Sequence, residues 1–239
     1  FLSWAEKRGY KVNPSYQTWE IIKRTHQPIA LTEEELNHLE NFFFKERHLS
    51  IARDYLVLES RTGARISDIQ RFDQKDVVST VENGTSIQTW VYQPKKGSRL
   101  HRQTVRLQFR GYTLPAWFIL AKHGFNLPKI SEQKLNENIK AACKKAGLTT
   151  PVTIERWAGS KRIVMTYPKY DCISTHTGKK TAITLMAQKG IPLPLISELC
   201  ATTIQTIIKH YIGKTDSKVM GEYLDKAGSG SESLMKKVI

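Results

Sequence analysis

A change of hydrophobic period in the middle of the chain most constrains its fold. Alternating apolar and polar residues in DVVST (76–80) and SIQTWVYQ (86–93) predict two strands, and the ENG turn between them is typical of a hairpin. The turn PKKGSR (94–99) and the segment LHRQTVRLQF (100–109) add a third strand. Elsewhere apolar residues recur at helical spacing. The sequence therefore predicts a mainly α fold with a small three-stranded antiparallel β-sheet.

Helical segments surround the predicted sheet. Thr32 and Glu35 form a capping box, and the helix that they begin is expected to continue through Glu46. A second helix is expected to end near Gly63 and a third to begin near Ser67. The same period predicts further helices at 114–125, 131–148, 174–186, 192–213 and 216–227.

The pattern divides the 239 residues into three parts. Residues 1–27 are expected to hold the end of an upstream domain and a linker, because an amphipathic start is followed by a segment with little helical period. Residues 28–226 are expected to form the main domain. Residues 227–239, with a Gly/Ser section and a short amphipathic piece, are expected to be a flexible C-terminal tail. The chain starts without methionine and is expected to be part of something longer.

The charge balance indicates a polyanionic partner. Lys and Arg number 37 against 22 Asp and Glu, which gives a net charge of +15. The basic residues are spread along the chain, so a folded basic surface is expected rather than a disordered arm. Such a surface attracts nucleic acid and, less often, an anionic membrane surface.

Cysteine usage and hydropathy bear on the compartment. Cys143, Cys172 and Cys200 are widely spaced and form neither a metal-binding pattern nor a disulfide framework. They are expected to be reduced thiols of a cytoplasmic protein. No apolar run approaches the length of a membrane span and no signal peptide is visible, so no membrane partner is expected.

The stretch STHTGKKTAITLM (174–186) opens a helix with cationic side chains. Its Ser and Thr residues suit a helix start, and an apolar stripe follows. His176, Lys179 and Lys180 are three and four residues apart, so they share one face near the N-terminus. Free N–H groups and the helix dipole favour an anion there. A phosphate is the expected guest; the alternative is a solvated helix start with incidental lysines.

Four further positions join this stretch in a candidate set. Arg65 follows the RTGA turn, Lys95 and Lys96 lie at the tip of a basic turn, and Tyr211 ends an apolar helical run. Each has an ordinary alternative, since an arginine beside a turn or a hairpin lysine is usually a surface charge and a tyrosine near a helix end usually packs. Their order along the chain favours a shared function.

This order resembles the tyrosine recombinases, the phage-integrase family of site-specific DNA recombinases. The resemblance extends from about Leu31 to about Lys226. It implies the catalytic-domain fold of the family, and residues 1–27 would then hold the end of the family's core-binding domain and the interdomain linker. The resemblance is carried by four motifs: SRTGARISDI (60–69), QPKKGS (93–98), STHTGKKTA (174–182) and TTIQTIIKHYIGKTD (202–216). The first and third of these motifs are similar in style to integrases of Bacteroidetes mobile elements.

The resemblance also implies roles. Tyr211 would attack a DNA phosphodiester, leaving a 3′-phosphotyrosyl link and a free 5′-hydroxyl. Arg65 would stabilise charge on the phosphate oxygens, and His176 would hydrogen-bond the phosphate and assist proton transfer. Lys95, with Lys96 as the near alternative, would protonate the leaving oxygen. The family needs no metal, and no cofactor is expected.

Three further positions, Asp68, Lys179 and Thr202, stand close to this set in the family pattern. Asp68 matches the acidic residue of the family that orients the neighbourhood of Arg65. Lys179 stands where the family usually has arginine, so the charge is kept but the bidentate fork is lost. Thr202, preceded by Ala201, stands where the family usually has His or Trp after Gly, and its hydroxyl can donate one hydrogen bond to phosphate. Lys179 and Thr202 favour a protein with weakened catalysis.

These sequence features are compatible with four functions. The leading hypothesis is a site-specific DNA recombinase or integrase acting on double-stranded DNA. A catalytically weakened or inactive DNA-binding protein on the same fold is the alternative. A basic helical RNA-binding protein would need stacking aromatics on the sheet, for which Trp90 and Tyr92 are candidates. A type IB topoisomerase shares similar chemistry. By resemblance, a homo-tetramer on DNA is expected, with a monomer in isolation as the alternative.

Overall fold

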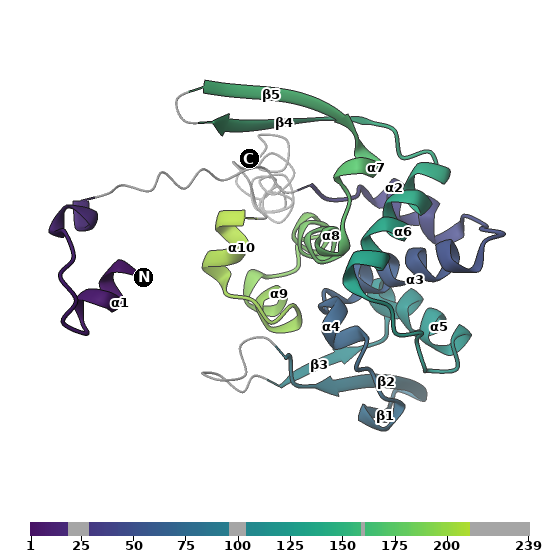
Figure 1. The fold of residues 1–239 in the computed structure, drawn as a ribbon. Helices are drawn as coiled ribbons and strands as arrows, with labels where there is room; N and C mark the ends of the chain where they lie inside the picture. Colours follow the sequence, from purple (N-terminus) through teal and green to yellow (C-terminus); the bar gives the residue numbers. More distant parts are fainter. Residues whose placement is uncertain (19–28, 96–103, 159–160, 211–239) are drawn as a thin grey trace, which may run out of the picture.

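The computed structural model describes residues 1–18, 29–95, 104–158 and 161–210 (Figure 1). Within these ranges the chain is mainly helical, with a three-stranded antiparallel sheet and a two-stranded antiparallel ribbon. The predicted fold class is therefore confirmed, and the ribbon is an addition to it. The predicted helix at 216–227 and the tail at 227–239 lie outside the described residues.

The N-terminal segment has little regular structure. Helix α1 (Leu2–Glu6) occupies the expected amphipathic start, and the short 3₁₀ helix η1 (Pro14–Thr18) lies in the expected linker. The hydroxyl of Tyr16 donates to a carboxylate oxygen of Glu6 at 2.5 Å, which joins the two elements.

Helix α2 (Glu33–Asn41) begins with the predicted capping box: the Thr32 hydroxyl accepts the Glu35 N–H at 3.2 Å, and the Glu35 carboxylate accepts the Thr32 N–H at 2.8 Å. The prediction that this helix runs through Glu46 is wrong. It ends at Asn41 because the Arg53 guanidinium replaces the N–H groups of a further turn. This guanidinium donates hydrogen bonds to the carbonyls of Leu39, Glu40 and Phe42 at 2.8–3.0 Å. Free carbonyls at a helix end need such partners.

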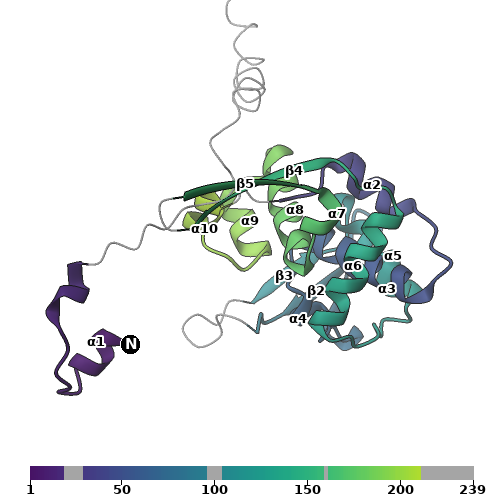
Figure 2. The same cartoon turned by 45° about the horizontal axis from the view of Figure 1, so that its top comes forward.

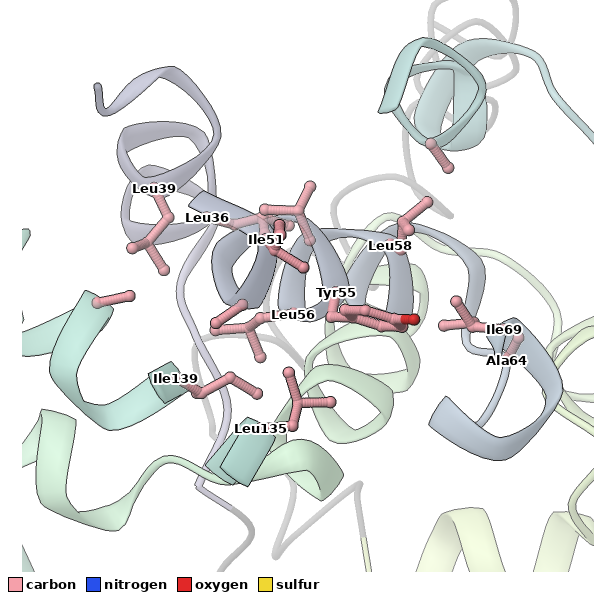
Figure 3. Close-up of a cluster of buried hydrophobic side chains, with 14 of the residues drawn as sticks. Leu36, Leu39, Ile51, Tyr55, Leu56, Leu58, Ala64, Ile69, Leu135 and Ile139 are labelled. Atoms are coloured by element: carbon pink, nitrogen blue, oxygen red, sulfur yellow. The ribbon is translucent and has the colours of Figure 1, made fainter. Parts of the chain in front are cut away.

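Helix α3 (Arg47–Thr62) is the central element of the core. It ends as predicted at Gly63, whose φ of 69° is left-handed and whose N–H donates to the Glu59 carbonyl. The short helix α4 (Ile66–Ile69) follows at once. Figure 3 shows Tyr55 and Leu56 of α3 in the cluster of buried side chains that also holds Leu135 and Ile139 of α6 (Glu132–Lys145). Burying each such side chain contributes about 1.5–3 kcal/mol. Helix α5 (Leu114–Lys122), preceded by the turn η3 (Gly111–Thr113), packs on the same α3.

The three-stranded sheet has the order β1 (Val77–Glu82), β2 (Thr85–Tyr92), β3 (Val105–Gln108). The short turn η2 (Gln74–Asp76) leads into it. Asn83 and Gly84 form the predicted hairpin turn, both with positive φ. Trp90 pairs with Leu107 and Tyr92 with Val105, and all four side chains are buried. The sheet therefore packs one face against the core.

The ribbon of β4 (Pro151–Ala158) and β5 (Lys161–Pro168) is absent from the sequence predictions. Alternation in VTIE and RIVMTY, with a GS pair between the strands, is the signal that identifies it. Helix α7 (Lys169–Cys172) connects β5 to helix α8 (Thr175–Gln188). Figures 1 and 2 show α8 lying between the ribbon and the three-stranded sheet.

The single helix predicted for 192–213 is wrong within the described part of that range. The structure has α9 (Leu193–Leu199) and α10 (Ile204–His210), joined by residues 200–203, which we name the α9–α10 turn. Ala201 in this turn has a φ of 44°. The Thr203 hydroxyl accepts the Thr206 N–H at 3.2 Å and so starts a new helix.

No helix in the four described ranges is long and apolar enough to cross a bilayer. Cys143, Cys172 and Cys200 are all unpaired thiols.

Candidate active site

The first turns of α8 present one exposed histidine and one buried lysine. Ser174 caps the helix in a reciprocal arrangement with Thr177, which fixes the start of α8. His176 is exposed, whereas Lys179, one turn further, is only 7% exposed. The two side chains share a helix face because they are three residues apart.

The ammonium group of Lys179 is engaged by the protein. It donates a hydrogen bond to the main-chain carbonyl of Cys200. The pKa of Lys179 is lowered to about 8, first because burial disfavours the charged form and then because Arg65 is close. A lysine with this environment is a titratable cation, unlike the arginine of the family pattern.

Arg65 contacts the residue that follows Cys200. It lies between Gly63 and α4, whose N-cap it forms. Its Nη2 donates to the carbonyl of Ala201 at 3.2 Å, and its Nη1 is buried with no hydrogen-bond partner among the described residues. A buried donor without a partner is costly, so Nη1 is suited to an incoming acceptor.

Thr202 follows these two carbonyls directly. Its N–H donates to the Ser197 carbonyl at 3.1 Å, and its own carbonyl accepts the Ser197 hydroxyl at 2.6 Å. The structure therefore brings Arg65, Lys179 and the backbone of the Thr202 turn together. His176 lies three residues before Lys179 on α8, with its side chain exposed.

Asp68 connects the Arg65 neighbourhood to the hairpin that carries Lys95. Its carboxylate is buried and accepts the Lys95 N–H at 2.9 Å and the Arg71 guanidinium at 2.8 Å. The Lys95 side chain is exposed. Lys96, the alternative hairpin residue, lies outside the described residues. Asp68 thus fixes the start of the basic turn relative to α4.

Glu59 is a site-proximal residue that the sequence predictions missed. It lies in α3, is 1% exposed, and its Oε2 has no hydrogen-bond partner within the part of the chain that the structure describes. Burial raises the pKa of Glu59 well above its ordinary range, while Lys179, the backbone N–H groups of Lys179 and Ile66, and Arg65 act in the opposite direction. A lone glutamate inside the apolar run YLVLES is the signal that could have identified it.

Gly178 makes this arrangement sterically feasible. A Cβ on Gly178 would lie 2.6 Å from Oε2 and 2.7 Å from Cβ of Glu59, closer than such atoms approach in proteins. Helices α3 and α8 therefore cross at the closest distance that a glycine permits, and this crossing holds Lys179 near Arg65.

Tyr211, the expected nucleophile, lies outside the described residues, which end with α10 at His210. The aromatic pair proposed as a platform for RNA bases is described. Trp90 and Tyr92 are 3% and 9% exposed and stack on each other at 3.9 Å between ring centroids. They are core residues, so the RNA-binding alternative loses its platform.

Among the described residues, no group of three His, Cys, Asp or Glu side chains is placed to hold a metal ion.

The fold matches that of tyrosine recombinase catalytic domains. No protein-family model and no curated protein matches the chain. Solved structures match at low identity. The pre-cleavage complex of the XerH site-specific recombinase bound to difH substrate has a TM-score of 0.55 and 16% identity, covering 95% of this chain and 61% of that chain.

Two other structures give the same result. The post-cleavage complex of XerH bound to palindromic difH substrate has a TM-score of 0.52 and 18% identity, covering 85% of this chain and 53% of that chain. The Tn1549 transposon integrase in complex with transposon right end DNA has a TM-score of 0.51 and 16% identity, covering 90% and 69%. The chain thus spans 53–61% of the XerH chains that it matches. At these identities the likeness is one of fold.

Proposed function

We propose that this chain is the catalytic part of a site-specific DNA recombinase or integrase. The observation that carries the proposal is the convergence of Arg65 and Lys179 on one turn, beside a helix N-terminus that presents His176. Fixed cations and free N–H groups are what the transition state of phosphoryl transfer requires. The recombinase fold adds support from an independent direction.

In the proposed reaction the phenolic oxygen of Tyr211 attacks a DNA phosphorus. The bond from phosphorus to the tyrosine oxygen forms as the bond to the 5′ oxygen breaks, which leaves a 3′-phosphotyrosyl link and a 5′-hydroxyl. His176 assists removal of the phenolic proton, and Lys95 or Lys96 gives a proton to the leaving oxygen. One phosphoester bond replaces another, so reversal rejoins the strand without a nucleotide cofactor. Tyr211 and Lys96 enter through the family resemblance alone.

Arg65 and Lys179 divide the charge stabilisation in this scheme. Arg65 offers a planar fork with one donor already free, and Lys179 offers a single point charge. Thr202 follows the two carbonyls that Lys179 and Arg65 contact, and its hydroxyl is proposed as a further donor. Losing one preorganised contact of this kind costs on the order of 10²–10³ in rate, so the swap from arginine to lysine matters for the activity.

A DNA-binding protein without cleavage is the second candidate function. The observation that favours it is the engagement of Lys179 by the Cys200 carbonyl, together with a threonine at the position usually held by His or Trp. Such a protein would keep phosphate affinity while lacking part of the proton-transfer machinery.

The proposed partner is double-stranded DNA, bound by a homo-tetramer that becomes a monomer in isolation. We propose that residues 1–27 are the end of a core-binding domain and the linker, that 28–226 form the catalytic domain, and that 227–239 are a flexible tail. The proposed location is the cytoplasm of a bacterial cell, where mobile DNA is a substrate.

A nicked suicide substrate tests the proposal. The full-length protein is incubated with DNA from the ends of its element, and a covalent protein–DNA adduct is sought on a denaturing gel. The enzyme is expected to give an adduct that disappears in Tyr211→Phe. Retarded DNA without an adduct, even after Lys179→Arg and Thr202→His are combined, would contradict the enzyme and support the DNA-binding protein.

A further inference from the structure

The two cationic side chains of the site, the buried Lys179 and the half-buried Arg65, both have main-chain partners. Lys179 donates to the carbonyl of Cys200, and Arg65 donates to the carbonyl of Ala201. These are consecutive carbonyls of the α9–α10 turn. Both cations therefore hold the backbone that leads into α10.

A phosphate is a stronger partner for these groups than a carbonyl. A phosphate oxygen carries negative charge, so its contact with a cation gains Coulomb attraction between two charges that a neutral carbonyl does not offer. Arg65 Nη1 is buried with no acceptor at all in the described residues, so an arriving phosphate oxygen satisfies a donor that the turn leaves open. Lys179 and Arg65 then gain from exchanging carbonyls for phosphate.

The backbone of the α9–α10 turn is strained at Ala201. Ala201 has a φ of 44°, in the left-handed region that residues with a Cβ rarely adopt. Apart from the two cations, it is held by the Ser197–Thr202 contacts and by burial of the Cys200 thiol. A strained conformation persists only while its surroundings determine it.

We propose that the α9–α10 turn occupies Lys179 and Arg65 in the DNA-free protein, and that a DNA phosphate takes over both side chains and releases the turn. The identity of the anion rests on the proposed function. In this scheme phosphate binding is coupled to the position of α10, because Lys179 and Arg65 cannot fully bind the phosphate and the two carbonyls of the turn at the same time.

Amide hydrogen exchange of the full chain tests this coupling. The amides of Cys200, Ala201 and Thr202 donate within the fold, so they report the turn directly. We expect exchange at these amides to become about tenfold faster when a short duplex of mixed sequence is added, as a charge-assisted contact is removed. Lys179→Met should show the faster exchange without DNA. Lys140→Met, at an exposed lysine of α6, is the control and should behave as the wild type.

The outcomes separate this inference from the proposed function. Wild-type protein that retards the duplex in a gel without any change in exchange at the turn overturns the inference and leaves DNA binding standing. Protein that retards no duplex contradicts the proposed function, and unchanged exchange in Lys179→Met then overturns the inference as well. If Lys179→Met does not fold, a ¹³C label on the Cys200 carbonyl of the wild type decides: a shift on adding the duplex is expected, and a constant signal overturns the release.

Discussion

Ala201 adopts a backbone conformation that suits glycine, the residue usual at this position in the resembling family. Its φ is 44°, and a Cβ in the left-handed region costs about 1–2 kcal/mol. Glycine avoids that cost but loses about 0.5–1 kcal/mol through the freedom of the unfolded chain. We expect Ala201→Gly to raise the free energy of unfolding by a few tenths to about 1 kcal/mol, measured by urea denaturation.

A control distinguishes backbone strain from a general effect of glycine. Ala187 lies in the last turns of α8, in right-handed helical backbone. Ala187→Gly should lower the free energy of unfolding by about 1 kcal/mol. Equal destabilisation by both changes would contradict the strain at Ala201.

Lys179 makes the proposed activity depend on pH in a way that arginine would not. The pKa of Lys179 is lowered to about 8 in the fold, and the protonated form is the one that attracts phosphate. The cation is therefore present below this pKa and is lost as pH rises through it. With subsaturating DNA, which reports the free protein, the single-turnover rate should fall about tenfold per pH unit above 8. Lys179→Arg should keep its rate, because arginine stays charged.

The same group has a defined effect on stability. An unfolded lysine has a pKa of about 10.4, so between pH 8 and that value the folded protein binds fewer protons than the unfolded one. This contribution therefore makes stability rise with pH in that window, opposite to the change in rate. A rate and a stability that fall together above pH 8 would mean that the protein unfolds rather than loses its cation.

At the scale of elements, the crossing of α3 and α8 sets the spacing of the site. The side chain of Glu59 fills the place beside Gly178 where a Cβ would stand. Gly178→Ala should lower the free energy of unfolding by about 1–3 kcal/mol, since extra atoms in a packed core force the helices apart. Glu59→Ala opens that space, so the double variant should recover part of the loss. Purely additive losses in the double-mutant cycle would contradict the contact.

The sequence predicts elements whose signals are local. The capping box at Thr32, the glycine end of α3 and the Asn83–Gly84 hairpin follow from neighbouring residues alone. The early end of α2 does not, because Arg53 reaches its carbonyls from another helix. The break between α9 and α10 is likewise set by distant side chains, Lys179 and Arg65.

The residues of the candidate site also fall into those that the sequence predicts and those that depend on the fold. Family order along the chain identifies Arg65, Lys179 and Asp68, which the fold brings into one neighbourhood. The local sequence does not show that Glu59 lies next to these residues, because its position depends on the crossing of α3 and α8. The predicted role of Tyr211 stays a prediction.

At the scale of the whole molecule, the net charge of +15 is the feature that governs the proposed association with DNA. Each phosphate neutralised by the protein releases counterions, and the logarithm of the affinity falls with the logarithm of salt concentration by about 0.9 per phosphate contact. We expect a steep salt dependence for wild-type protein in a gel-shift titration. Arg65→Ala should reduce that slope by about 1. An unchanged slope would mean that Arg65 does not contact a phosphate in the complex.

The three thiols of the molecule differ in their access to reagents. The Cys200 side chain presses against Gly63 and is 1% exposed, and burial raises its pKa to about 11. Cys143 is also closed to solvent, with a pKa raised to about 12, whereas Cys172 is half-buried. An alkylating reagent at neutral pH therefore modifies Cys172 first. Because Cys200 belongs to the α9–α10 turn, the slow alkylation of its sulfur measures how often that turn leaves Gly63, and the native protein carries this probe without any added label.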